Sequence, residues 1–238
     1  MFEVMPSLRA LLRNLPGAIR IIDRGEPLPA VDYYCPLLSL PYALKTRIET
    51  IPAQVPYLAA EPQRAAKWMQ RLRALPGVRV GLAWQGNVLV EKLIWARGRS
   101  MPLAALEPLA HLPGVSLVSL QKGPGLEQVR STPFADRIVD LSSDLDRGAD
   151  AFLDTAAVMA GLDLVIGCDT SIVHLAGALG RPVWTALTVS PEWRWLLDRN
   201  DSPWYPTMRL FRQTVDGDWS TVVTAMAQAL GALASQRA

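Results

Sequence analysis

The chain has 238 residues, of which 50% are hydrophobic and 19% charged, enough apolar material for one large or two small domains. A net charge of +2 argues against a surface dedicated to nucleic acid, and no apolar run approaches the roughly 18 residues of a membrane span. Cys35 and Cys168 form neither a disulfide framework nor a metal-ligand cluster, and Arg9 and Arg13 interrupt the apolar N-terminus, so we expect a cytoplasmic protein without a signal peptide.

The first 76 residues divide into two short segments. Residues 1–48 carry a helix with leucines at helical spacing over Ser7–Asn14, between apolar runs that predict strands. These strands are expected at Phe2–Met5, Ala18–Ile22 and Val31–Leu38. Residues 49–76 combine a proline-rich extended linker over Glu49–Pro62 with an amphipathic helix over Gln63–Leu75.

From residue 77 to residue 238, strands and helices alternate. Strands are predicted at Val78–Trp84, Val115–Leu120, Ile138–Leu141, Leu164–Gly167, Val183–Leu187 and Met208–Phe211. Helices are predicted at Pro102–Leu112, Leu126–Ser131, Ala149–Ala160, Ile172–Leu179 and Trp219–Leu233. This alternation predicts an α/β fold with a doubly wound parallel sheet, which places ligands beyond the carboxyl ends of the strands.

The stretch Leu164–Trp184 is the most informative part of this domain. A buried strand leads into the polar loop Asp169-Thr170-Ser171, and a helix follows that Gly180 and Pro182 terminate. The free amides and the positive dipole end of such a helix suit a phosphate group. Alternatively, Asp169 or Thr170 serves only as the N-cap of the helix.

Four segments in one order carry a family resemblance. The sequence D-T-S-x-x-H-L-A-G-A-L-G-R-P-V-W over Asp169–Trp184 resembles the nucleotide-sugar motif of glycosyltransferase family 9, the ADP-heptose:lipopolysaccharide heptosyltransferases. It is more similar still to bacterial glycosyltransferase-like domains that often follow tetratricopeptide repeats. Further segments similar to this second group are Val80–Asn87, Val118–Gly125 and Trp193–Gln213.

The resemblance implies a GT-B fold of two Rossmann-like domains, of which residues 77–238 would be the C-terminal, nucleotide-sugar-binding domain. Residues 49–76 would then be linker and helix, and residues 1–48 a remnant of the N-terminal, acceptor-side domain. A complete domain of that kind needs ~100 residues or more. We therefore expect the N-terminal α/β portion to be incomplete.

The resemblance also implies which residues bind the donor. Thr170 and Ser171 would bind its diphosphate, and His174 would lie beside it. Because a carboxylate would repel phosphate, we place Asp169 against sugar or ribose hydroxyls, or as the helix cap. After the strand that ends at Leu120, Lys122 is a candidate for stabilising the leaving diphosphate, and Gln121 and Gly123 flank it. An ordinary exposed lysine and a satisfied core histidine are the structural alternatives.

The loop after Trp84 supplies Gln85, Gly86 and Asn87, which can read hydroxyls or phosphate oxygens. Beyond Asn87 the chain departs from its relatives, and only Arg99-Ser100 keeps their pattern. Lys92, Arg97 or Arg99 could supply positive charge to this loop. Four tryptophans lie close together in the sequence, namely Trp184, Trp193, Trp195 and Trp204. Such clusters are expected in a core or interface more often than stacked on a base or sugar. Glu192 and Arg194 are weaker ligand candidates.

As the resemblance implies, the chain would bind a nucleoside-diphosphate sugar and transfer the sugar with inversion, with no metal and no other cofactor. Its acceptor is undetermined (a saccharide, a lipid-linked glycan or a protein), and no catalytic residue is assigned. Two alternatives are a non-catalytic nucleotide-sugar-binding module and an interaction domain with a decayed pocket. A homodimer through the unfinished N-terminal sheet edge is also expected.

Overall fold

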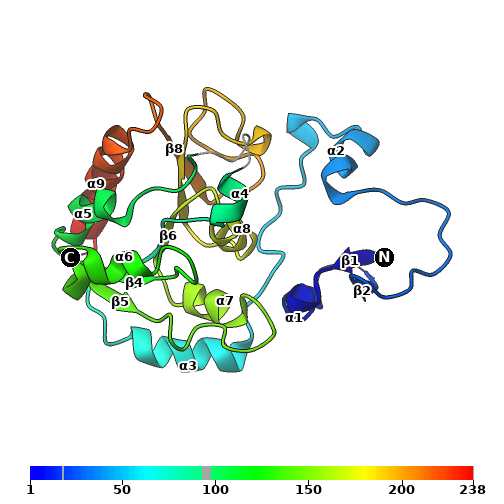
Figure 1. Cartoon of the computed structure of the whole chain (residues 1–238), viewed down its shortest axis with the longest axis horizontal. Coiled ribbons are helices and arrows are strands. Elements are labelled where there is room, and N and C mark those ends of the chain that lie inside the picture. Colours follow the sequence, from blue (N-terminus) through cyan, green and yellow to red (C-terminus); the bar gives the residue numbers. More distant parts are fainter. Residues whose placement is uncertain (18, 93–97, 238) are drawn as a thin grey trace.

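A wholly parallel sheet forms the centre of the main domain in the computed structural model, which describes residues 1–17, 19–92 and 98–237 (Figure 1). Within these residues the sheet has six strands, in the order β5-β4-β3-β6-β7-β8. Their bounds are β3 Val78–Ala83, β4 Val115–Ser119, β5 Ile138–Asp140, β6 Leu164–Cys168, β7 Val183–Leu187 and β8 Met208–Arg212. The predicted α/β fold with a doubly wound parallel sheet is confirmed.

Helices cover both faces of this sheet (Figure 1). One face is covered by α3 (Pro62–Leu72), α7 (Leu153–Ala160) and α8 (Ser171–Ala178). The other face carries α5 (Glu107–Ala110), α6 (Glu127–Ser131) and α9 (Ser220–Ser235). Among the described residues, no helix is long and apolar enough to cross a membrane.

Side chains of each strand alternate between two apolar cores, because successive residues of a strand point to opposite faces. In β6, Leu164 and Ile166 pack into the core beneath α9, whereas Val165 packs into the core beneath α7 and α8. All three are at most 2% exposed. Burial on both faces explains why the strands read as continuous apolar runs in the sequence.

The strand order reverses between β3 and β6. The chain runs outward from β3 through β4 to β5 on one side, and from β6 through β7 to β8 on the other. β3 and β6 are direct neighbours, with Ala83 paired to Gly167 at their carboxyl ends. Ligands of open α/β sheets bind in the crevice at such a reversal, so the loops that follow Ala83 and Cys168 occupy the ligand position.

The N-terminal segment lies beside the main domain and forms little regular structure (Figure 1). It contains the parallel strands β1 (Phe2–Val4) and β2 (Ile21–Asp23), a 3-10 turn at Pro6–Leu8, α1 (Arg9–Leu12), a second 3-10 turn at Leu37–Ser39 and α2 (Leu40–Ala43). The linker then docks on α8, where the backbone amides of Tyr57 and Leu58 donate to the Ala178 carbonyl at 3.0 and 3.1 Å.

Two N-terminal predictions need correction. The predicted strand Val31–Leu38 is wrong, because this stretch is irregular and ends in a 3-10 turn. Pro36 interrupts the run and cannot donate to a strand ladder, which confines proline to sheet edges and non-strand segments. The strand predicted over Ala18–Ile22 is displaced to Ile21–Asp23, and Ala18 lies outside the described residues.

Two helix predictions also need correction. The helix predicted over Pro102–Leu112 is a 3-10 turn, Leu103–Leu106, followed by the single turn α5. Pro108 lacks the N–H that a continuous α-helix would need there. The helix predicted from Ala149 begins at Leu153, because Phe152 adopts a left-handed conformation with φ of 66°. The short helix α4 (Val88–Glu91) was not predicted.

Candidate functional site

Two neighbouring cavities open at the carboxyl edge of the sheet. The larger, about 790 Å³, lies between the loops after β3 and β4, the loop before α7 and the start of α8. The smaller, about 300 Å³, lies between the loops after β6 and β7. Arg99, Thr170 and Ser171 line both cavities, so they mark the place where the cavities meet.

Nine of the ten predicted donor-binding residues line one or both cavities. The larger cavity has Gln85, Gly86, Asn87, Gln121, Lys122, Thr170 and Ser171 in its wall. The smaller has Asp169, Thr170, Ser171 and His174. The tenth residue, Gly123, is not one of the residues that line these two cavities; it lies in the turn after β4, where its φ of 73° suits glycine.

The N-terminus of α8 faces the junction of the two cavities. Thr170 is its N-cap residue, yet its side chain makes no capping hydrogen bond, and its buried Oγ1 has no partner among the described residues. Ser171 and Ile172 are the first two residues of α8, so their amides have no acceptor within the helix. Unpaired donors at the positive end of a helix dipole favour an anion here.

The other end of α8 follows the sequence prediction closely. Gly180 has a φ of 65° and its amide donates to the Gly177 carbonyl at 2.9 Å. The Arg181 amide donates to the Ala176 carbonyl at 2.9 Å, completing the hydrogen-bond pair that closes a helix through a left-handed glycine. The helix is therefore anchored at its C-terminal end and unsatisfied at the end that meets the cavities.

Arg99 is a site residue that the prediction named only as a possible source of charge. Its side chain is 22% exposed and lies 3.6 Å from Glu91. The Gly86 amide donates to Ser100 Oγ at 2.9 Å, and Ser100 also bonds to Glu91. A Cβ on Gly86 would approach Arg99 and Glu91 to 3.0 Å, so glycine permits this packing. The retained Arg99-Ser100 pair was the available sequence signal.

Lys92, another cation of that loop, does not add to this site. Lys92 is exposed and is not part of either cavity wall as described. Arg97 lies outside the described residues. Asn87, from the same loop, accepts the Leu89 amide through its Oδ1 at 2.9 Å, which begins α4 at the cavity rim.

Gln121 organises the loops and has little capacity left for a ligand. Its Oε1 accepts the backbone amides of Trp84 and Gln85, each at 3.1 Å. Its Nε2 donates to the carbonyls of Gln85 and Pro124 at 2.9 and 2.8 Å. The side chain is 5% exposed, so we interpret Gln121 as a positioning group that holds the loops after β3 and β4 together.

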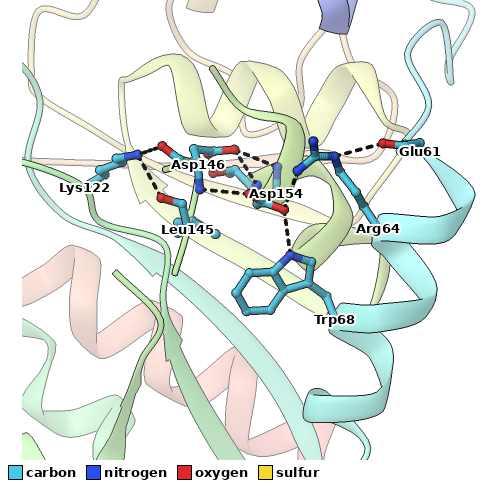
Figure 2. Close-up of polar contacts among 8 residues, drawn as sticks. Glu61, Arg64, Trp68, Lys122, Leu145, Asp146 and Asp154 are labelled. Atoms are coloured by element: carbon cyan, nitrogen blue, oxygen red, sulfur yellow. Dashed lines mark hydrogen bonds and ion pairs between the residues drawn. The ribbon is translucent and has the colours of Figure 1, made fainter. Parts of the chain in front are cut away.

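Lys122 belongs to a polar network that reaches back to α3 (Figure 2). Its ammonium donates to the backbone carbonyls of Leu145 and Asp146. The Asp146 carboxylate accepts the Asp154 amide at 2.6 Å and thereby caps α7. Lys122 also lines the larger cavity, so its charge is fixed at the cavity wall by the loop that caps the helix.

Asp154 connects this loop to α3, as Figure 2 shows. Its carboxylate accepts the indole N–H of Trp68 at 3.0 Å, Arg64 at 3.0 Å and the Asp146 amide at 3.1 Å. Burial by itself would raise the pKa of Asp154, but the hydrogen bonds from Trp68 and Arg64 hold this pKa below its usual range. Asp154 is therefore ionised near neutral pH and links α3, α7 and the Lys122 loop.

His174 and Asp169 form the floor of the smaller cavity. The imidazole Nε2 lies 3.8 Å from Asp169 Oδ1, and Nδ1 lies 3.2 Å from the Tyr205 hydroxyl. Burial, with a smaller contribution from the nearby Arg194 charge, lowers the pKa of His174 to about 4. Burial raises the pKa of Asp169, and the nearby Glu192 adds to this shift. His174 is consequently a neutral hydrogen-bonding group near pH 7.

The tryptophans flank the site at a distance from the larger cavity. Trp195 is fully buried and stacks on His174 with ring centroids 5.0 Å apart. Trp184 packs against Phe211, as expected for core residues. Glu192 and Arg194 line the smaller cavity and pair with each other at 2.7 Å. Among the described residues, no cluster of three or more His, Cys, Asp or Glu side chains could hold a metal ion.

Comparisons with known proteins identify the family and fold that this chain resembles. Residues 150–213, which include α7, β6, α8 and β7, match the family model of glycosyltransferase family 9 (heptosyltransferase). Protein FlbA of Caulobacter vibrioides is 33% identical over 208 residues, which make up 84% of this chain and 33% of that protein. The predicted resemblance to family 9 is confirmed.

Two solved structures share the fold. Escherichia coli ADP-heptose lipopolysaccharide heptosyltransferase II has 14% identity and a TM-score of 0.54, over 79% of this chain and 56% of that one. The family 9 glycosyltransferase of Veillonella parvula has 14% identity and a TM-score of 0.51, over 77% and 53%. The chain thus spans about a third of its curated relative and just over half of each solved structure.

Proposed function

We propose that this chain, whose residues 150–213 carry the family 9 sequence, is the nucleotide-sugar-binding part of a glycosyltransferase. The single observation that supports this most is the meeting of two cavities at the unpaired N-terminus of α8. A cation, Arg99, and an unpartnered hydroxyl, Thr170, lie at the same point. A nucleoside-diphosphate sugar carries a charged diphosphate between a nucleoside and a sugar, so its shape and charge suit two cavities that meet at a cation.

The cavities differ in size and character, and this orients the donor. The larger cavity, about 790 Å³, is wide enough for a nucleoside and includes the apolar side chains of Leu120, Phe152 and Ile172. The smaller, about 300 Å³, presents Asp169, Glu192 and His174, which can bond to sugar hydroxyls. We infer that the nucleoside occupies the larger cavity and the sugar the smaller one.

The proposed reaction is transfer with inversion and without a metal. The acceptor hydroxyl attacks the anomeric carbon from the face opposite the diphosphate, and a new C–O bond forms. The bond from this carbon to the diphosphate breaks, and the diphosphate leaves with the electron pair. The acceptor proton passes to a general base, to which we assign no residue.

Fixed positive charge replaces a divalent ion in this proposal. The α8 amides and Arg99 face the diphosphate, and Lys122 lies in the wall of the same cavity. Groups already oriented toward developing charge stabilise a leaving group because they need no reorganisation during the reaction. We further propose that the chain is cytoplasmic and is associated with tetratricopeptide repeats.

Thermal unfolding with a panel of nucleoside diphosphates and their sugars, in EDTA, tests the donor site. ADP leads the panel because the E. coli neighbour is named for ADP-heptose. A ligand at 100 times its Kd adds about 2.7 kcal/mol of stability. We expect one diphosphate to stabilise the chain, at least tenfold weaker affinity in Arg99→Ala and Lys122→Ala, and no change in Lys67→Ala, which lies exposed on α3.

Other outcomes identify the alternatives. Stabilisation without sugar transfer or donor hydrolysis would indicate a binding module. No stabilisation by any ligand would favour the interaction domain, for which the exposed apolar residues between 28 and 48 are a specific supporting observation. A shift that appears only when EDTA is replaced by a divalent metal would contradict metal independence.

A further inference from the structure

We infer that the acceptor carries an apolar ring or a short branched apolar group, and that this group binds in a third cavity beside the sugar pocket. The inference rests on the proposed transfer reaction. The cavity measures about 310 Å³ and lies between residues 37–52 and the loop 193–205. Most of the residues that line it line neither of the two donor cavities.

The two walls of this third cavity are strongly apolar. One wall comes from the N-terminal segment and includes Leu37, Leu38 and Leu44, which are 59%, 67% and 72% exposed. The opposite wall includes Trp193, which is 50% exposed. Apolar side chains that face one another across a water-filled space gain free energy when an apolar group displaces that water.

The aromatic wall is held in place before any ligand arrives. Trp193 meets Trp204 edge to face, with ring centroids 5.9 Å apart and an interplanar angle of 82°. Tyr205 packs so closely on α8 that a Cβ at Gly177 would come within 2.5 Å of its ring. Rings fixed by such contacts lose little conformational entropy on binding, so the wall suits a flat apolar group.

His174 and Arg194 connect this cavity to the sugar pocket, because both residues line both spaces. Arg194 is paired to Glu192, which faces the sugar side, so the boundary is polar while the third cavity is apolar. A molecule whose apolar group occupies the third cavity would present its remaining atoms to the sugar pocket across this boundary. A hydroxyl of that molecule would then lie next to the proposed sugar pocket.

The volume identifies the size of the occupant. About 310 Å³ lies at the small end of ligand pockets, so the cavity accepts one ring or a short branched chain. A second nucleoside diphosphate is a poor occupant because Arg194 is the single Lys or Arg among the described lining residues. The acceptor is therefore recognised through an apolar group, whatever larger molecule bears it.

Phenyl β-D-glucoside, with methyl β-D-glucoside as its matched control, probes the cavity on the full 238-residue chain. We expect saturation-transfer NMR signals from the phenyl protons, with millimolar affinity and no comparable signal from the methyl glucoside. Affinity should fall at least tenfold in Trp193→Ala and in Leu38→Glu. It should be unchanged in Leu197→Ala, a 70% exposed residue of the same loop outside the described lining.

Equal binding of both glucosides, absence of phenyl binding, or phenyl binding that survives both wall substitutions would overturn the inference. The nucleoside diphosphate shift, measured on the same samples, separates the two proposals. If phenyl binding holds and no diphosphate binds, the proposed function fails and the apolar cavity stands. If a diphosphate binds and the phenyl group does not, the donor site stands and the acceptor inference fails.

Discussion

Burial of the His174 imidazole lowers its pKa to about 4, so the folded chain takes up this proton much less readily than the unfolded chain, whose histidine titrates near 6.5. Above pH 6.5 both states are neutral and the group has no effect on stability. Between pH 6.5 and 4 only the unfolded state gains the proton, and folding is disfavoured progressively. Below about pH 4 both states are protonated and the effect is complete.

We therefore predict that stability falls by about 3 kcal/mol from this group as pH drops from 6.5 to 4. His174→Gln should show a smaller fall over this window in urea unfolding at a series of pH values. The raised pKa of the neighbouring Asp169 acts in the opposite direction, because the folded state accepts that proton early. Comparison of the wild-type and His174→Gln slopes isolates the contribution of His174.

Single residues also show why the structure was needed to identify the residues that bind the nucleotide-sugar donor. Gln121 follows a strand and was predicted to bind the donor, yet its side-chain amide forms hydrogen bonds to the protein backbone. Arg99 follows a stretch that departs from its relatives and was named only as one of three sources of positive charge, yet it lines both cavities. Residue type and position after a strand indicate the edge of the sheet, whereas the direction of a side chain depends on its neighbours in space.

At the scale of elements, the N-terminus of α8 allows two roles for Thr170 to be distinguished: a structural N-cap and a ligand-binding residue. If Thr170 were a working N-cap, its removal would cost about 0.5–2 kcal/mol. Its side chain makes no capping bond and its Oγ1 lacks a partner among the described residues. We predict that Thr170→Val leaves the urea-unfolding free energy within about 0.5 kcal/mol and weakens diphosphate affinity several-fold.

Ser220→Ala at the exposed start of α9 is the matched control for Thr170→Val. Its hydroxyl is bonded to Asp218 at 2.9 Å, so this substitution removes a local bond far from the cavities. It should leave diphosphate affinity unchanged. Loss of more than about 1 kcal/mol in Thr170→Val with unchanged affinity would instead support the simple cap.

The link between α3 and α7 depends on Asp154. We predict that Asp154→Ala destabilises the chain by about 2 kcal/mol, because Arg64, Trp68 and the Asp146 amide lose their acceptor together. The Leu145–Asp146 carbonyls that hold Lys122 should loosen, and diphosphate affinity should fall. Urea unfolding and the ligand panel measure the two effects, and the exposed Asp136→Ala should change neither. An unchanged affinity would show that the network is only structural.

At the scale of the whole molecule, exposed large hydrophobic side chains are concentrated in the N-terminal segment. Over residues 28–48, all within the described part, nine large hydrophobic side chains are at least half exposed. They are Leu28, Val31, Tyr33, Tyr34, Leu37, Leu38, Tyr42, Leu44 and Ile48. The parallel pair β1–β2 lies beside them, and a parallel pair with so little cover is marginal by itself.

We propose that two copies of the chain associate through the β1–β2 edge and the exposed apolar residues beside it that lie outside the third cavity, namely Leu28, Val31, Tyr33 and Tyr34. Tyr33 and Tyr34 are 93% and 72% exposed beside this pair and would be buried in the dimer. Sedimentation velocity should show a mass that rises with concentration, and Tyr33→Glu should shift the chain to monomer. Val215→Glu, at a 61% exposed position of the main domain, should not. A monomer at all concentrations would contradict this proposal.

The sequence by itself was sufficient for the fold class, the positions of the six main strands and the loops that meet at the sheet edge. These follow from local patterns: buried apolar runs, helical spacing, and Gly180 with Pro182 after a helix. It failed where prolines and a left-handed residue altered local structure, at Pro36, Pro108 and Phe152.

Only the tertiary structure decided which side chains face the cavities. The reversal of strand order between β3 and β6 brings Arg99 to Thr170 and Ser171, which are about 70 residues away in the chain. The Asp154 network and the apolar cavity at Trp193 likewise join segments that no local pattern connects. Local patterns specify elements because neighbouring residues dictate them, whereas a site depends on packing between elements that are distant in the sequence.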